Sequence, residues 1–195
     1  MTVVEHLYVH APFCARRCPY CDFAVKVRRT GGHEAWISAI QAELRIREDG
    51  GTVELASPLR TVFVGGGTPS LLGSGAMSAL RDVLSSGRLS GPGLEWTAEA
   101  TPESLTAEVG EDWRSAGVTR VSIGVQSFDE GVLRWMGRLH GPDGAGQAVA
   151  VARDAGFEDV SLDLIFGLPG HLKRDLETDL DRALSLAPTH LSLYG

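Results

Sequence analysis

The sequence predicts an α/β fold in which six β/α units form a partial barrel, with a parallel sheet inside and helices on the outer face. Short runs that alternate apolar and polar residues recur along the 195 residues, and segments with helical periodicity separate them. In most of these runs the polar residues fall on one face, because alternate residues of a strand point to opposite sides of the sheet. Strands that alternate with helices are typical of βαβ units and a parallel sheet.

Six runs are expected to be strands because they are short and alternate with period two. They are His6–His10, Thr61–Gly65, Glu95–Ala100, Arg120–Gln126, Asp159–Phe166 and His190–Tyr194. A flat sheet with helices on both faces would have apolar residues on both sides of each strand. One polar face therefore favours a curved sheet whose inner side surrounds a polar ligand. The alternative is a two-layer sheet with one solvated face.

Five segments between the strands have apolar residues at helical spacing. They are Glu34–Arg47, Gly75–Ser86, Ser104–Ala116, Gly144–Ala155 and Leu172–Leu186. Trp36, Ile40 and Leu44 form one apolar stripe, as expected for a helix that packs against the sheet. We expect a single domain over residues 1–195, which ends at the sixth strand.

Composition excludes several classes of protein. The formal net charge of −7 argues against a nucleic-acid-binding protein, which would need a basic surface. No apolar run approaches the roughly 20 residues of a membrane-spanning helix. The first ten residues lack the features of a signal peptide. We therefore expect a cytoplasmic protein without a membrane span.

Cys14, Cys18 and Cys21 are all the cysteines of the chain, and their C-x3-C-x2-C motif directly follows the first strand. An odd number of cysteines so closely spaced is a poor basis for disulfides. Thiolates are the usual ligands of iron–sulfur clusters, and three of them can bind three irons of a [4Fe–4S] cluster while the fourth iron stays open. The alternative is a zinc site of three cysteines and a histidine such as His10, although structural zinc usually takes its ligands as two separated pairs.

Further candidate site residues follow the later strands. Gly65-Gly66-Gly67-Thr68 comes after the second strand, and three glycines allow a close approach of the backbone and expose N–H groups. Glu99, Gln126 and Asp163 lie near the carboxyl ends of strands, where barrel folds gather their ligand-binding groups. A carboxylate suits the hydroxyls of a ribose, and Arg138 suits a ligand carboxylate.

With these motifs the chain resembles the radical S-adenosylmethionine (SAM) enzymes, and among them the oxygen-independent coproporphyrinogen III oxidase family, from about Tyr8 to Tyr194. The resemblance implies a [4Fe–4S] cluster on the three cysteines, SAM at the open iron, and reductive cleavage of SAM in a full-length protein. It identifies no catalytic side chain. The SAM-binding residues that it implies are Tyr8, Tyr20, Gly66, Gly67, Thr68, Glu99, Gln126, Arg138 and Asp163.

This family contains at least two activities. The oxidase decarboxylates two propionates of coproporphyrinogen III, and its cluster loop carries an additional cysteine two residues beyond the third. Phe23 stands there in this chain, which argues against decarboxylase activity and resembles the heme chaperone branch.

The heme chaperone branch implies further partners. They are heme or porphyrin, a reductant protein such as a flavodoxin, and a heme-acceptor protein. Family members continue well past the sixth strand, so the resemblance also implies that this chain is truncated at its C-terminus.

Overall fold

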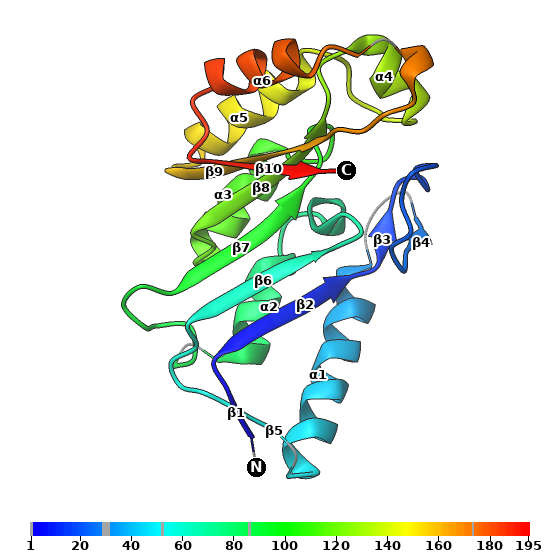
Figure 1. The fold of residues 1–195 in the computed structure, drawn as a ribbon. Coiled ribbons are helices and arrows are strands. Elements are labelled where there is room, and N and C mark those ends of the chain that lie inside the picture. Colours follow the sequence, from blue (N-terminus) through cyan, green and yellow to red (C-terminus); the bar gives the residue numbers. More distant parts are fainter. Residues whose placement is uncertain (1, 29–31, 52, 86, 173) are drawn as a thin grey trace.

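A computed structural model describes residues 2–28, 32–51, 53–85, 87–172 and 174–195, and its centre is a parallel sheet (Figure 1). The sheet has six strands in the order β10-β9-β8-β7-β6-β2, and every neighbouring pair is parallel. These strands are β2 (His6–Ala11), β6 (Thr61–Gly66), β7 (Glu95–Ala100), β8 (Arg120–Gln126), β9 (Asp159–Ile165) and β10 (His190–Tyr194). The six predicted strands are therefore confirmed, with bounds that differ by one residue at most.

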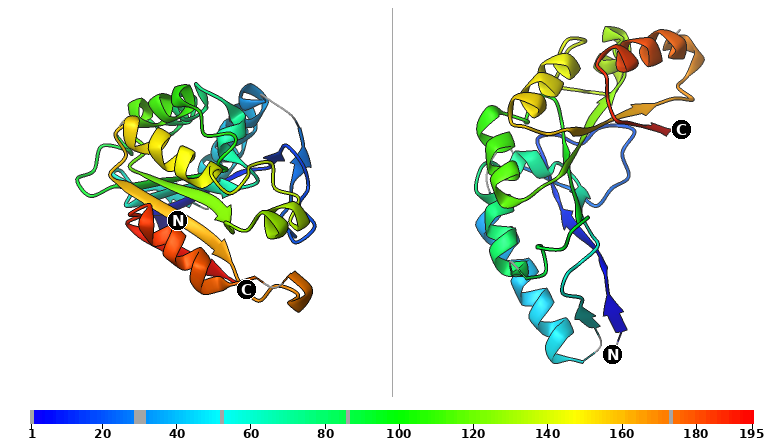
Figure 2. Two further views of the ribbon diagram at one scale, coloured as in Figure 1. Left: turned by 90° about the horizontal axis from the view of Figure 1, so that it is seen from above. Right: turned by 90° about the vertical axis from the view of Figure 1, so that its left-hand side faces the viewer.

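The helices follow the strands in the expected alternation. They are α1 (His33–Asp49), α2 (Ala76–Leu84), α3 (Ala107–Ala116), α4 (Glu130–Trp135), α5 (Gly144–Asp154) and α6 (Leu176–Ser185), with 3₁₀ turns at Pro69–Leu72 and Gly170–Leu172. Figure 2 shows the helices following one another along one side of a curved, open layer of strands. The predicted partial barrel with helices on its outer face is thereby confirmed.

The core lies between the helices and the outer face of the sheet. Val121, Ile123 and Val125 of β8 point into it and are fully buried. Trp96 of β7 and Trp113 of α3 are among its largest buried side chains. Because successive residues of a strand alternate between faces, this packing turns the polar residues of the same strands towards the concave side.

Two predicted helices begin three or four residues later than their periodicity indicated, because a capping side chain sets the first turn. α3 begins after Thr106, whose side chain accepts a hydrogen bond from the Val109 N–H, and not at Ser104. α6 begins after Asp175, which caps the Glu177 N–H, and not at Leu172.

Some short elements escaped prediction. α4 has six residues, which is too few for a periodic apolar pattern. The small strands β1 (Thr2–Val4), β3 (Phe13–Cys14), β4 (Lys26–Val27) and β5 (Val53–Leu55) have two or three residues each. The predicted end of the second helix, Ser86, lies outside the described residues. No helix in the described part of the chain is long and apolar enough to cross a membrane.

The cysteine motif lies at the carboxyl end of β2. β3 and β4 pair in parallel, and the segment that connects them is the loop that carries Cys18 and Cys21. α1 is tied to β2 by the Trp36 indole, whose Nε1 donates to the His10 carbonyl over 2.8 Å. The topology thus brings the cysteine loop to the edge of the sheet at which the other strands end.

Candidate functional site

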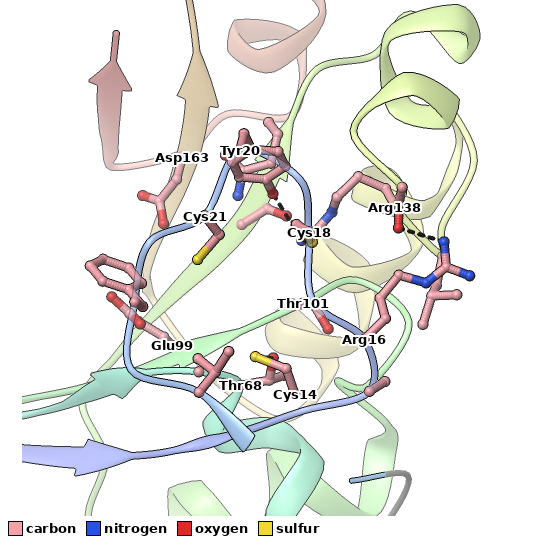
Figure 3. A pocket seen from close by; sticks show the side chains of 18 of the residues that line it. Cys14, Arg16, Cys18, Tyr20, Cys21, Thr68, Glu99, Thr101, Arg138 and Asp163 are labelled. Carbon is pink, nitrogen blue, oxygen red and sulfur yellow. Dashed lines mark hydrogen bonds between the residues drawn. The ribbon is translucent and has the colours of Figure 1, made fainter. Parts of the chain in front are cut away.

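A cavity of about 430 Å³ lies between the cysteine loop and the carboxyl ends of the strands. This volume is within the range of roughly 300–1,000 Å³ that is typical of sites for small organic ligands. Cys14, Cys18 and Cys21 all line it. Figure 3 shows their side chains around one hollow, with Glu99 on one side and Arg138 on the other.

The structure brings together nearly all of the residues for which the sequence predicted SAM contacts. The cavity is lined by Tyr20, Gly66, Gly67, Thr68, Glu99, Gln126, Arg138 and Asp163. Tyr8 is the exception. Its ring is exposed on the same face of the sheet, stacks on Phe63, and its hydroxyl donates to His10 Nδ1 over 3.1 Å. Tyr8 therefore lies beside the cavity and does not line it.

Hydrogen-bond donors point at two of the three sulfurs. Thr68 Oγ1 lies 3.6 Å from Cys14 Sγ, and Arg138 Nη1 lies 4.0 Å from Cys18 Sγ. Burial raises the pKa of the Cys14 thiol, and the Thr68 hydroxyl opposes this effect. Donors and a cation beside sulfur suit thiolates, which are the form that binds metal. The residues present therefore fit a thiolate-bound cluster.

His10 does not complete a zinc site. Its Nε2 donates to the Ala24 carbonyl over 2.9 Å, so its Nδ1 accepts from Tyr8, and its ring does not line the cavity. Among the described residues, no three His, Cys, Asp or Glu side chains converge as the ligands of a single ion do. The thiolates of a [4Fe–4S] cluster need not converge on one point in this way, because each of them binds a different iron.

The glycine motif packs against the strand segment that leads to Cys14. The Gly67 N–H donates to the Ala11 carbonyl and the Thr68 N–H to the Phe13 carbonyl, each over 2.7 Å, while the Gly66 N–H donates to Glu99. A Cβ on Gly67 would lie only 2.6 Å from the Phe13 oxygen. The expectation of exposed N–H groups was wrong, because these three donors already have partners in the protein. The glycines instead allow the backbone that follows β6 to pack directly against the backbone of residues 11–13.

Glu99 and Asp163 place two carboxyl groups in the cavity. Burial raises the pKa of Glu99, and the nearby Asp163 raises it further. Burial also raises the pKa of Asp163, against the effect of hydrogen bonds from Ser122, whose Oγ lies 3.0 Å away. Two buried carboxyl groups close to each other favour neutral forms or a ligand that donates hydrogen bonds to them.

Gln126 reaches the cavity through an irregular strand end. β8 contains a bulge between Gly124 and Gln126, and Gln126 has a left-handed backbone with φ of 68°. Such a conformation costs on the order of 1–3 kcal/mol and persists only where its surroundings impose it. The surroundings here include Arg174, whose Nη2 donates to the Gln126 carbonyl over 3.4 Å.

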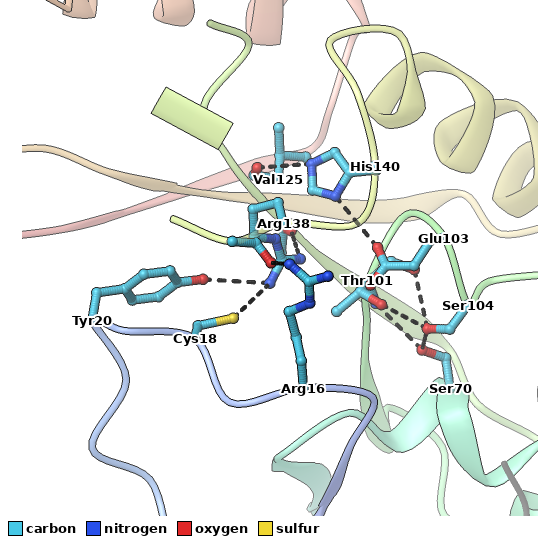
Figure 4. Close-up of polar contacts among 12 residues, drawn as sticks. Arg16, Cys18, Tyr20, Ser70, Thr101, Glu103, Ser104, Val125, Arg138 and His140 are labelled. Carbon is cyan, nitrogen blue, oxygen red and sulfur yellow. Dashed lines mark hydrogen bonds and ion pairs between the residues drawn. The ribbon is translucent and has the colours of Figure 1, made fainter. Parts of the chain in front are cut away.

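Arg138 joins the cysteine loop to β8. Its Nη2 donates to the Gly124 carbonyl over 2.8 Å, and its Nη1 lies 3.4 Å from the Tyr20 hydroxyl (Figure 4). Burial acts to raise the pKa of Glu103, but a hydrogen bond from His140 and the charge of Arg138 outweigh it, so the pKa of Glu103 is lowered. Glu103 is thus an ionised partner for Arg138.

Several cavity residues were missed by the sequence analysis. Arg16, Glu103, Leu139 and Tyr194 line the cavity as well, as does Phe23, which the sequence analysis had singled out only for the absence of a fourth cysteine. Tyr194 could have been found, because it shares the polar face of its strand with His190 and Ser192. The others lie in loops and have no periodic signal. His140 is buried against Glu103 and the Val125 carbonyl.

Comparisons with known proteins agree with this geometry. The chain is 40% identical over 193 residues to the heme chaperone HemW of Mycobacterium tuberculosis (strain CDC 1551 / Oshkosh), an alignment that covers 97% of this chain and 48% of the relative. It is 38% identical over 189 residues to HemW of Escherichia coli K12, covering 96% and 49%. The chain therefore spans about half the length of the curated relatives it matches.

A solved structure shares the fold. Coproporphyrinogen III oxidase (HemN) from Escherichia coli, described as a radical SAM enzyme, superimposes with a TM-score of 0.81 at 28% identity, over 98% of this chain and 43% of that one. Residues 8–183 match the Radical SAM superfamily, and this stretch includes the cysteine loop and the cavity-lining strand ends from β6 to β9. By the match and by the arrangement of its site, the chain belongs to the radical SAM superfamily.

Proposed function

We propose that this chain holds a [4Fe–4S] cluster on Cys14, Cys18 and Cys21, binds SAM beside it, and serves a heme-chaperone-like protein. The observation that carries the proposal is the convergence of three thiols on one cavity whose opposite walls bear carboxyl groups and an arginine. When bound, such a cluster would supply an electron to the sulfonium of SAM.

The residues of the chain suit the parts of SAM. Glu99 and Asp163 offer acceptors to ribose hydroxyls or to an amino group. Arg138 offers donors to the carboxylate of the methionine end. Its Nε is buried and finds no hydrogen-bond partner among the described residues, so a donor is left over for a ligand. A buried polar group without a partner is costly, and a movement of the Arg138 side chain that brought its Nε to a ligand carboxylate would remove that cost.

Heme is proposed as a second ligand. The support is the similarity to proteins named heme chaperones and the apolar rim of the cavity. Phe23, Leu139 and Tyr194 line the cavity and expose 61%, 47% and 55% of their surface. Large exposed apolar side chains gathered at one place mark binding surfaces.

Decarboxylation of coproporphyrinogen III is the second candidate, and it is supported by the structural likeness to HemN. Phe23 favours the chaperone over this oxidase, because the oxidase family has a cysteine there. Product analysis with coproporphyrinogen III separates the two, since an oxidase yields vinyl groups and a chaperone leaves the porphyrin side chains intact.

The three free thiols and the electron that a cluster would pass to SAM bear on the cellular compartment and on the partners of the protein. Cys14, Cys18 and Cys21 form no disulfide, and free thiols persist in reducing compartments. We place the protein in the cytoplasm, with a reductant protein such as a flavodoxin and a heme-acceptor protein as its partners.

Anaerobic reconstitution with iron and sulfide tests the proposal. The wild-type chain should hold about four irons and four sulfides, and the EPR spectrum of the reduced sample should change when SAM is added. Cys18→Ser should lose most of the iron. Bound zinc without an EPR signal would overturn the cluster assignment, whereas a cluster whose spectrum ignores SAM would overturn only the SAM site.

Hemin titration tests the second ligand. Absorbance at the Soret band should saturate with the wild-type chain, and Phe23→Ser should weaken this binding without changing the iron content of the reconstituted sample. Equal hemin binding by both proteins would show that the cavity rim is not the heme site.

A further inference from the structure

We propose that Arg16 is a positioning residue that closes a clasp between the cysteine loop and the turn at Gly137–Arg138, and that this clasp holds Cys18 and Cys21 in place for the cluster. The inference rests on the proposed function of this cavity. It concerns a residue that the cysteine motif leaves unspecified, since Arg16 is one of the three residues between Cys14 and Cys18.

The clasp consists of two arginines that reach in opposite directions. Arg16 Nη1, on the cysteine loop, donates to the Gly137 carbonyl over 2.8 Å. Arg138, the next residue of the turn, reaches back to the Tyr20 hydroxyl and to Cys18 Sγ. Figure 4 shows both guanidinium groups between the loop and the turn. The two segments are thus tied at two points, although 121 residues separate Arg16 from Gly137.

The hydrogen bonds to the turn at Gly137–Arg138 hold the middle of the cysteine loop in place. Between Cys14 and Ala24 the chain has no helix or strand among its described residues, and its internal backbone hydrogen bond runs from the Cys21 N–H to the Cys18 carbonyl. The hydrogen bonds that the structure shows from residues 15–23 to the rest of the described chain go to Gly137 and Arg138. The ends of the loop are held by the pairing of β3 with β4 and by the bond from His10 to the Ala24 carbonyl. Loss of the Arg16 bond would therefore leave residues 15–23 hydrogen-bonded to the rest of the described chain through Arg138 alone.

A glycine in the turn allows the loop to approach it closely. Gly137 has φ of 68°, a left-handed conformation that favours glycine. A Cβ there would lie 3.5 Å from Arg16 Nη1 and 3.6 Å from the Pro19 ring. The loop therefore approaches the turn closely at Gly137, the residue whose carbonyl accepts the hydrogen bond from Arg16.

Arg17 provides a matched control. It is adjacent to Arg16, carries the same charge and lies at a similar distance from the cysteines along the chain. Both side chains are exposed, but Arg17 does not line the cavity and has no hydrogen bond or ion pair within the described chain. Substitution of either arginine removes one positive charge from the loop, and only substitution of Arg16 opens the clasp.

Thiol alkylation of the metal-free chain tests the clasp without a cluster. Iodoacetamide labelling of Cys18 and Cys21, resolved by mass spectrometry, should be roughly three- to tenfold faster in Arg16→Ala than in wild type, because loss of a hydrogen bond from a charged group opens the loop more often. Arg17→Ala should label at the wild-type rate, because Arg17 makes no contact that holds the loop to the turn. Arg16→Lys should fall between, because lysine keeps the charge and one donor.

Iron retention links the clasp to the cluster. After anaerobic reconstitution and gel filtration, Arg16→Ala should retain less than half of the iron that Arg17→Ala retains, with unchanged circular dichroism. Equal labelling and equal iron in the two alanine variants would overturn the proposal. A wild-type chain that binds no iron, together with fast labelling in Arg16→Ala, would refute the proposed function and leave the clasp standing as a structural device.

Discussion

The buried carboxylate Asp179 supports the strand end that carries Gln126, and its removal should destabilise the chain strongly. Asp179 lies in the first turn of α6, and its side chain is 3% exposed. It accepts hydrogen bonds from Ser127 Oγ over 2.6 Å and from the Phe128 N–H over 2.8 Å. Its Oδ2 also lies 2.7 Å from Arg174, whose side chain is 5% exposed.

The expected magnitude follows from what Asp179→Ala leaves behind. Removal of one partner of a buried ion pair typically costs about 3–5 kcal/mol, because the other charge stays buried without compensation. Arg174 would be that charge, and the Phe128 N–H would also lose its acceptor. We expect a loss of about 4 kcal/mol, which for a chain of this size corresponds to a fall in Tm of roughly 8–16 °C.

Urea denaturation of the metal-free chain, followed by circular dichroism, measures this loss. The control is Glu130→Ala, which removes an i,i+4 ion pair to Arg134 with side chains 71% and 75% exposed, and should cost at most about 0.5 kcal/mol. Asp179→Leu combined with Arg174→Met removes both charges and should cost less than Asp179→Ala alone. A loss below about 1 kcal/mol for Asp179→Ala would refute the assignment of this pair as a support of the site.

Three further predictions concern the cavity and its supports. The pKa of Glu99 is raised by burial and by Asp163, so the folded chain binds more protons than the unfolded one near this pKa, and the contribution of Glu99 to stability is lost as pH rises through it. Glu99→Gln should therefore gain stability relative to wild type as pH rises above about 4, the ordinary pKa of a glutamate, as followed by urea denaturation, and parallel pH profiles would contradict the raised pKa. Gly67→Ala should cost about 1–3 kcal/mol and lower iron retention, because its Cβ would meet the Phe13 and Ala11 carbonyls. Gly141→Ala, where a Cβ meets nothing within 4 Å, is the control, and equal losses would exclude this clash. Trp36→Phe should cost about 1–2 kcal/mol in thermal unfolding, because the His10 carbonyl would lose its donor, and an unchanged Tm would show that this bond does not anchor α1.

Local pattern accounts for the part of the fold that could be predicted. The six strands and the faces they present follow from alternation, which each strand carries within itself. In a parallel sheet the carboxyl ends meet at one edge, so Glu99, Gln126 and Asp163 could be expected together before any contact was known. Cys14, Cys18 and Cys21 lie on one short loop, and their proximity needs no long-range information.

The remaining features depend on contacts between residues far apart in the chain. Asp179 is a charged residue on a helix, and the sequence pattern alone would place its side chain in solvent. Only the position of α6 beside the end of β8 buries it against Ser127 and Phe128. Arg16 meets Gly137 because two loops without periodic pattern cross at the cavity. Thr106 and Asp175 set helix starts through side-chain caps that apolar periodicity does not register. Periodicity specifies which face of an element is buried, whereas the partners of a polar side chain are decided by the path of the chain in three dimensions.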